Sequence, residues 1–300
     1  MPQCSFRALI VAVPFVFGLS VSHAQETRDA AEFLQSYRWR LNEPSFGGFS
    51  AIELDETGNR FVTLSDRATV WSGRINRDAA GAISSVFTED MAVLRDGRGK
   101  PLNKAIGDSE GLAVAEDGGL YISFEGRARV SSYATPESPE RMLPRVMGFK
   151  SLPKNGSLEA LAIGPDGALY TLPEDAIAGR SDSPVWRFSG ARWSQPFGIP
   201  RDGAWKPVGA DFGPDGRFYL LERDLRGLAG FATRVRVFDI SGDRISAGEV
   251  VLETPPGRHG DLEGIAVWRD AAGAIRLTMI ADDNFSTFLS TEIVEYRLPH

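Results

Sequence analysis

The sequence predicts an all-β fold, a single β-propeller of five four-stranded blades closed by an N-terminal strand. Three observations support this prediction: one hairpin-like unit returns five times, further β-rich runs follow each copy, and one early strand has no partner nearby. The copies begin about 50 to 60 residues apart, a period that is typical of solenoids and propellers. They start at Gly47, Gly107, Gly156, Lys206 and Gly260.

Each copy has the pattern of a β-hairpin. In the second copy, the apolar run Leu112–Val114 is followed by the turn Glu116–Gly119 and by a second apolar run, Leu120–Phe124. Two more strands are expected after this hairpin, at Arg129–Tyr133 and Arg145–Lys150. Four antiparallel strands per unit, repeated radially, make the blades of a propeller.

The two ends of the chain are expected to meet in the last blade. The fifth unit supplies strands near Gly264–Trp268, Ile275–Ala281 and Glu292–Leu298, one fewer than the other units. The run Gln35–Leu41 alternates as a half-buried strand does, and it completes the fifth blade. Ring closure then hides the sheet edges. Six blades, the alternative, would need another hairpin, which the sequence does not show.

The N-terminal segment has the pattern of a cleavable export signal. The apolar run Ala8–Val21 is too short for a comfortable membrane span, and Ser22-His23-Ala24 matches a cleavage site. We therefore divide the chain into a signal peptide, residues 1–24, and one propeller domain, residues 25–300. The mature protein is expected in the periplasm or outside the cell, without a membrane span. It is also expected to lack disulfides, because the only cysteine is Cys4.

Acidic residues recur at two places in the repeated hairpin. The start of its first strand and the end of its second strand lie at the same end, so these residues gather around one mouth of the central channel. At the first place the residues are Ser50, Glu110, Glu159, Val208 and Glu263. At the second place they are Asp66, Glu125, Glu174, Arg223 with Asp224, and Asp282 with Asp283.

This acidic mouth predicts a metal site. Ca²⁺ takes six to eight oxygen ligands, so Ca²⁺ or another hard divalent cation fits a ring of carboxylates. The mature chain has no cysteine, which makes zinc and copper poor matches. Asp108 and Asp261 are expected to cap loops, and the alternative for the whole ring is that its acids only satisfy backbone donors. The predicted ligands are Glu110, Glu125, Glu159, Glu174, Glu263 and Asp283.

Candidate substrate-binding and catalytic residues lie at the same mouth. Arginines that grip an anionic group are expected next to the acids, although simple salt bridges are the alternative. Asp66 and Asp282 are candidate proton acceptors, and so is His259, for which a solvated loop position is the alternative. There is no Gly-x-Ser-x-Gly motif for a serine nucleophile. The candidate substrate-binding arginines are Arg67, Arg127 and Arg223.

The repeated motifs resemble those of exported bacterial proteins with a phytase-like, or esterase-like, domain. The resemblance covers roughly Phe46 to Leu298 and implies a propeller that hydrolyses phosphoesters or esters with calcium. Glu110-Gly111 and Glu263-Gly264 also look like the metal-holding pair of regucalcin and gluconolactonase propellers, whereas a lysine-rich phosphate pocket of true phytases is lacking. The motifs are Asp108-Ser109-Glu110-Gly111-Leu112, Ser157-Leu158-Glu159-Ala160-Leu161, Asp261-Leu262-Glu263-Gly264-Ile265 and Asp282-Asp283-Asn284-Phe285.

Two functions from different classes follow from these patterns. The first is a calcium-dependent hydrolase of an ester, phosphoester or lactone, with its site at the channel mouth and a small anionic or ester substrate. The second is a non-catalytic propeller of the cell envelope that binds a partner or glycan, with a metal that is only structural. A nucleic-acid partner is excluded because 40 acidic residues outnumber 33 basic ones without a basic cluster. We expect a monomer.

Overall fold

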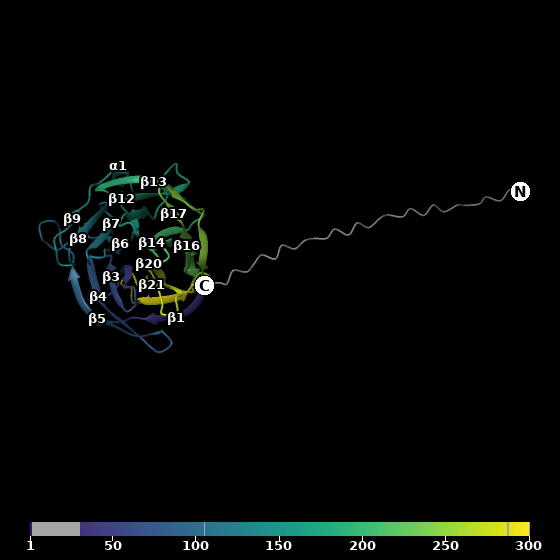
Figure 1. Ribbon diagram of the computed structural model, residues 1–300, viewed down its shortest axis with the longest axis horizontal. Helices are drawn as coiled ribbons and strands as arrows, with labels where there is room; N and C mark the ends of the chain where they lie inside the picture. The colour runs from purple at the N-terminus through teal and green to yellow at the C-terminus, as the bar shows by residue number, and fades with distance from the viewer. Residues whose placement is uncertain (2–30, 105, 287, 300) are drawn as a thin grey trace.

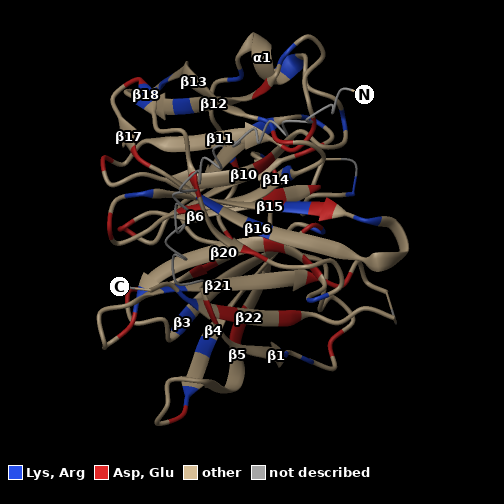
Figure 2. Ribbon diagram, turned by 90° about the vertical axis from the view of Figure 1, so that its right-hand side faces the viewer, with Lys and Arg blue, Asp and Glu red and all other residues tan. Residues whose placement is uncertain are grey.

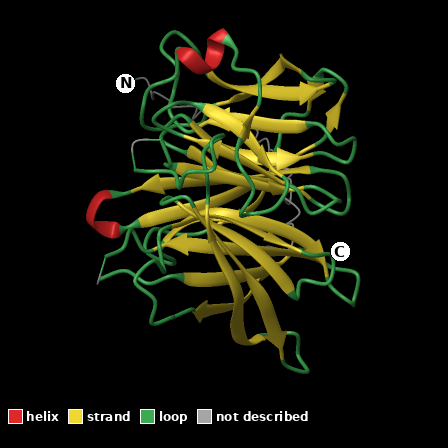
Figure 3. Ribbon diagram, turned by 90° about the vertical axis from the view of Figure 1, so that its left-hand side faces the viewer, coloured by secondary structure: helices red, strands yellow, loops and turns green. Residues whose placement is uncertain are grey.

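Five four-stranded antiparallel sheets stand in a ring, as the sequence predicts (Figure 1). This arrangement comes from a computed structural model, which describes residues 1, 31–104, 106–286 and 288–299. The expected signal peptide and its cleavage site lie outside the described residues. Strands dominate the described part of the chain, with only two short helical turns, α1 (Met147–Lys150) and η1 (Gly227–Ala229) (Figure 3). None of the helices in these residues is long and apolar enough to cross a membrane.

The blades follow one another along the chain. Blade one contains β2 (Phe49–Leu54), β3 (Arg60–Ser65), β4 (Thr69–Arg77) and β5 (Ile83–Val93). Blade two contains β6 (Ser109–Val114), β7 (Leu120–Phe124), β8 (Arg129–Tyr133) and β9 (Arg141–Met142). Blade three contains β10 (Leu158–Ile163), β11 (Leu169–Pro173), β12 (Asp182–Ser189) and β13 (Arg192–Pro200).

Blades four and five depart slightly from this plan. Blade four contains β14 (Lys206–Phe212), β15 (Phe218–Leu225), β16 (Phe231–Phe238) and β19 (Glu249–Glu253). A small hairpin, β17 (Ile240–Ser241) with β18 (Arg244–Ile245), precedes its last strand. Blade five contains β20 (Asp261–Arg269), β21 (Ile275–Asp282), β22 (Glu292–Arg297) and the N-terminal β1 (Glu32–Arg38).

The predicted closure by the N-terminal strand is confirmed. β1 pairs antiparallel with β22, with Arg38 opposite Glu292, and it begins three residues before the expected Gln35. Blade five is locked to blade one by a buried ion pair, because Glu295 on β22 accepts two hydrogen bonds of 2.8 Å from Arg77 on β4. The ring therefore has five blades, and both chain ends contribute to the last one.

The expected fourth strand of blade two, Arg145–Lys150, is wrong. The strand that forms there is the two-residue β9, and Met147–Lys150 is the helical turn α1. Pro144 supplies no N–H for a ladder, so pairing ends before it. Phe149 in this segment is buried by edge-on packing against two tryptophans. Its ring centroid lies 5.3 Å from that of Trp186 and 5.0 Å from that of Trp193.

The first strands of the blades pack around the axis. β2 contacts β6 and β20, and β10 contacts β6 and β14, so these strands line the channel. Glycines allow this close approach, because a Cβ on Gly111 would lie 2.5 Å from the carbonyl oxygen of Glu159. A Cβ on Gly264 would lie 2.7 Å from Cα of Ala51. The axis is therefore nearly filled by backbone, and a ligand has room only at the mouths.

Candidate functional site

A β-bulge marks the same position in the first strand of every blade. In blade three, Leu158 is opposite Pro173 and Ala160 is opposite Leu172, which leaves Glu159 as the extra residue. A bulge bends the strand and re-aims the side chain of the extra residue. The residues at these five bulges are the ones that the repeat alignment placed at the first strand's start: Ser50, Glu110, Glu159, Val208 and Glu263.

The residues at the end of the second strand lie at one level of the ring. Glu125 follows β7, and its N–H donates to the carbonyl of Asp108, while the Glu174 N–H donates to Ser157 in the same way. In blades four and five the equivalent pairs are Arg223 with Lys206 and Asp282 with Asp261. Antiparallel pairing in the same register therefore brings the second set of residues to the same mouth as the bulges. The ring at this level consists of Asp66, Glu125, Glu174, Arg223 and Asp282.

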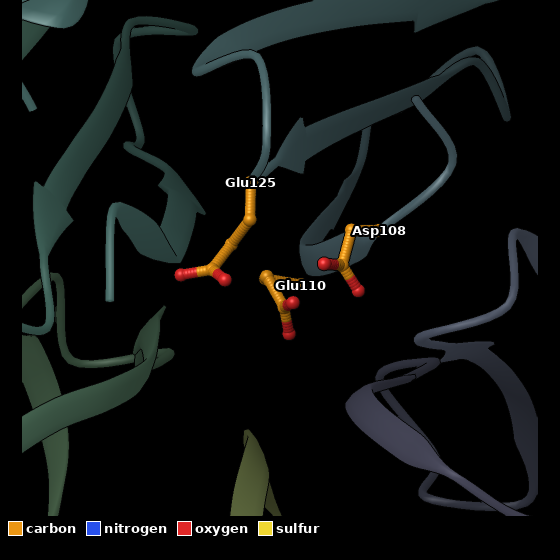
Figure 4. Close-up of side chains that lie close together, drawn as sticks. All are labelled: Asp108, Glu110 and Glu125. Atoms are coloured by element: carbon orange, nitrogen blue, oxygen red, sulfur yellow. The ribbon is translucent and has the colours of Figure 1, made fainter. Parts of the chain in front are cut away.

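Three carboxylates of blade two come close together. One oxygen atom each of Asp108, Glu110 and Glu125 lies within 4.8 Å of the other two. Figure 4 shows the three side chains around one space, with Glu110 between the other two. Glu159 of blade three lies near these acids, because Glu110 and Glu125 both contribute to raising its pKa. Because oxygens about 2.4 Å from one Ca²⁺ ion lie at most about 4.8 Å apart, this donor set fits a calcium ion.

Burial makes this group of acids costly without a counter-charge. The pKa of Glu110 is raised well above its usual value by burial, then by the charges of Glu125, Asp108 and Asp66. Burial also raises the pKa of Glu159, with Glu110 as the largest charged contributor. Raised pKa values mean that the charged carboxylates are disfavoured in the folded protein. A bound cation would favour the charged carboxylates and so lower these pKa values. The electrostatics and the oxygen–oxygen distances therefore both favour a bound calcium ion.

Asp66 and Asp282 flank the cluster from blades one and five. Burial raises the pKa of Asp66 to about 6, although the Arg67 charge opposes the shift. Burial raises the pKa of Asp282 to about 7, and the Asp66 charge adds to the shift. Both predicted proton acceptors therefore lie beside the ring, with pKa values near those that suit a general base at neutral pH.

The opposite side of the ring carries its own cation. Arg223 donates to Glu174 at 3.0 Å, to Asp261 at 2.6 Å and, in a still shorter contact, to Glu263. Lys206 adds a contact of 2.7 Å to Asp175. Basic and acidic segments adjoin at the end of β15 in Figure 2. Three of the acids on this side are thus neutralised by Arg223, whereas Asp108, Glu110 and Glu125 have no ion pair with another described residue.

Two predicted site residues make contacts of a different kind. His259 Nε2 lies 2.7 Å from the Tyr296 hydroxyl oxygen. Burial lowers the His259 pKa to about 4, so the imidazole is neutral at pH 7. None of its contacts within the described residues is with an acid of the ring. Asp283 accepts hydrogen bonds from the Gly48 N–H at 2.9 Å and the Thr291 hydroxyl at 3.0 Å. The geometry of Asp283 is that of a loop cap.

The rim arginines differ from Arg223. Arg67 is exposed, and its guanidinium carbon lies 3.1 Å from the ring centroid of Phe285. Phe285 and its neighbour Asn284 have φ values of 48° and 51°, in the left-handed region that bulky residues rarely adopt. Arg127 is also exposed, directly after the Glu125-Gly126 corner. Neither arginine has an ion pair in the described part of the chain, so both present free guanidinium donors beside the acids.

The sequence reasoning missed two features of this site. Asp108 was expected to cap a loop, but it belongs to the acid cluster; its place two residues before Glu110 in the repeat was the available signal. The bulges were also not expected, although a glycine follows the bulged residue in three blades, at Gly111, Gly209 and Gly264. Glycine inside a strand pattern is a known bulge signal.

The propeller is similar to several solved structures. An α-L-arabinofuranosidase from Podospora anserina has a TM-score of 0.51 at 12% identity, with 91% of this chain and 98% of that chain covered. A gluconolactonase from Xanthomonas campestris has a TM-score of 0.44 at 18% identity, with coverages of 80% and 69%. At these identities the likeness concerns the fold alone. No curated protein sequence matches the chain.

The sequence match to a family is more extensive. The family described as phytase-like, with esterase-like activity of phytase, matches residues 44–285. This range contains all five bulges and every acid of the ring, and it leaves out two strands of the last blade, β1 and β22. The chain therefore belongs to the phytase-like family.

Proposed function

We propose that the protein is a calcium-dependent hydrolase of an ester, phosphoester or lactone, with its site on the blade-two side of the channel mouth. The observation that carries this proposal is the cluster of Asp108, Glu110 and Glu125, whose oxygens lie within 4.8 Å of one another. Glu159, whose pKa is raised by its neighbours Glu110 and Glu125, adds a fourth carboxylate. The family description supports the hydrolase class and leaves the substrate open.

The residues divide the chemistry among themselves. Asp108, Glu110, Glu125 and Glu159 would hold the cation, which supplies polarisation of a substrate oxygen and a lowered pKa of a water molecule. Asp66 or Asp282 would take the proton from the attacking water; their pKa values of about 6 and about 7 suit that role.

Positive groups at the mouth would select an anionic substrate. Arg67 is exposed and is held in place by the Phe285 ring, so its donors face solvent beside Asp66. Arg127 has a similar position beside Glu125. Arg223, which the sequence also suggested for substrate binding, is already paired with three acids and would instead fix the shape of the site's far wall.

The site of action belongs to the same proposal. An exported protein meets the millimolar calcium that weak, open sites of this kind require. The pattern of residues 1–24 is that of a cleavable signal peptide, so we propose that the mature protein acts in the periplasm or outside the cell.

A hydrolase assay tests the proposal. The mature protein, residues 25–300, is given an aryl phosphate, an aryl carboxylate ester and a lactone, each with calcium and with a chelator. We expect hydrolysis of at least one class with calcium and its loss with chelator. Asp66→Asn should lower the rate by about 10²–10⁴-fold if it is the general base. No hydrolysis of any class would favour the non-catalytic envelope propeller instead.

A further inference from the structure

Three arginines of blade two lie together near the start of β8, directly after the Glu125-Gly126 corner. Arg127 follows Glu125 by two residues, and its N–H donates to the Glu125 carbonyl oxygen. Arg145 reaches the same corner, because its Nε donates to the carbonyl oxygen of Ala128 at 2.8 Å. Arg129, which lies between these two residues in the sequence, is buried. It forms an ion pair with Glu140 at 2.7 Å. Glu140 is therefore the one carboxylate that forms an ion pair with any of these three arginines among the described residues.

Arg127 and Arg145 have no ion pair within the residues that the structure describes. The charges of Arg127 and Arg129 add to burial in lowering the pKa of Arg145, which shows that the three groups repel one another. Arg129 also has a buried Nη1 without a hydrogen-bond partner. Like charges held together in this way are unfavourable unless an anion joins them.

The basic residues of blade four have acidic partners. Arg223 contacts three acids, Lys206 contacts Asp175 at 2.7 Å, and Arg226 contacts Asp224 at 2.6 Å. The basic groups of blade four thus have counter-charges, whereas Arg127 and Arg145 at the blade-two corner have none among the described residues. Guanidinium groups with free donors suit oxyanions, which they bind by parallel charge-assisted hydrogen bonds.

We propose that Arg127 and Arg145 form an oxyanion subsite that binds a phosphate or carboxylate group of the substrate at the corner that follows Glu125. The proposal rests on the proposed function for the identity of the reacting bond, and it adds the substrate class: an ester that carries an oxyanion on the blade-two side. Arg145 was not among the residues that the sequence suggested, because its segment was expected to form a strand.

Binding of simple anions tests the subsite. Sulfate, which stays soluble with millimolar calcium, stands in for a phosphate group, and acetate stands in for a carboxylate. Isothermal titration of the mature protein with each anion, with and without calcium, is expected to show saturable binding of at least one. Arg127→Gln and Arg145→Gln should each weaken this binding roughly tenfold or more, the loss expected for one charge-assisted hydrogen bond. The tighter of the two anions identifies the substrate's group.

Arg141→Gln is the matched control. Arg141 is an exposed arginine on β9 of the same blade, so its removal changes the net charge equally without touching the corner. Equal weakening by Arg141→Gln, unchanged binding in the other two variants, or no binding of either anion would overturn the subsite. The calcium-dependent melting temperature is read in the same samples. Anion binding without a calcium effect would keep the subsite and reject the metal-dependent hydrolase.

Discussion

One residue divides the acidic mouth into two halves. Arg223 stands where the other blades carry an acid, and its partners Glu174, Asp261 and Glu263 come from blades three and five. Removing one partner of a buried ion pair usually costs about 3–5 kcal/mol, so this arginine also holds three blades together. The sequence showed that blade four departs from the repeat, but only the side-chain geometry shows that Arg223 pairs with acids instead of facing a substrate.

A second pair of acids lies towards the opposite ends of the inner strands. Asp211 on β14 accepts hydrogen bonds from Val267 N–H at 2.6 Å and Phe212 N–H at 2.7 Å, yet burial raises its pKa to about 7. Burial, and then the charge of Asp211, raise the pKa of Glu53 on β2. The folded protein therefore keeps protons that the unfolded chain releases above about pH 4, so stability falls as pH rises towards 7.

The variant Glu53→Gln should weaken this pH dependence. It removes the charge that burial disfavours, so its melting temperature relative to wild type should be higher at pH 8 than at pH 5. Thermal unfolding at the two pH values measures the difference. Glu116→Gln, an exposed acid in the neighbouring blade, is the control and should follow wild type. A constant difference between Glu53→Gln and wild type at both pH values would contradict the assignment.

At the scale of single elements, the bulge explains why the repeat carries function. Strict alternation along a strand would send the residues before and after the bulge position to one face, whereas the extra residue of a bulge breaks this alternation and re-aims one side chain at the mouth. In blade five this residue is Glu263, between Leu262 and Gly264, which are opposite Ala281 and Ile280. Apolar runs on both sides of a Gly/Asp turn predicted the hairpins, because both strands of each hairpin are buried. They did not predict the bulges, because one extra residue does not change the apolar pattern enough.

The N-terminal strand β1 gives a test at the same scale. Deleting residues 32–41 removes the edge strand of blade five and the buried Trp39, which stacks on Phe49 of blade one with ring centroids 5.2 Å apart. Loss of a buried tryptophan alone costs about 3–5 kcal/mol. At roughly 2–4 °C per kcal/mol, the melting temperature should fall by about 10 °C or more, with aggregation through the exposed edge. A truncated protein with the same melting temperature as the full mature chain would refute this role of β1.

At the scale of the whole molecule, the sequence predicted the ring, its five blades and the meeting of the two chain ends. These features follow from the period of the repeat and from the missing fourth strand of the last unit, which local patterns reveal. The predicted fourth strand of blade two was wrong, because Pro144 ends the ladder and the segment after it is positioned by packing such as that of Phe149. The division of the acids depends on contacts between blades, such as those of Arg223, and no local pattern encodes such contacts.

The most direct test of the account is the effect of calcium on thermal stability. A ligand at 100 times its dissociation constant stabilises the folded state by about 2.7 kcal/mol, or roughly 5–10 °C here. The mature protein should melt higher by this amount with calcium than with chelator. Glu110→Gln and Glu125→Gln should lose most of the increment, whereas Asp166→Asn, in an exposed turn of blade three, should keep it. Equal melting of the wild type with calcium and with chelator would contradict the metal site and the hydrolase that depends on it.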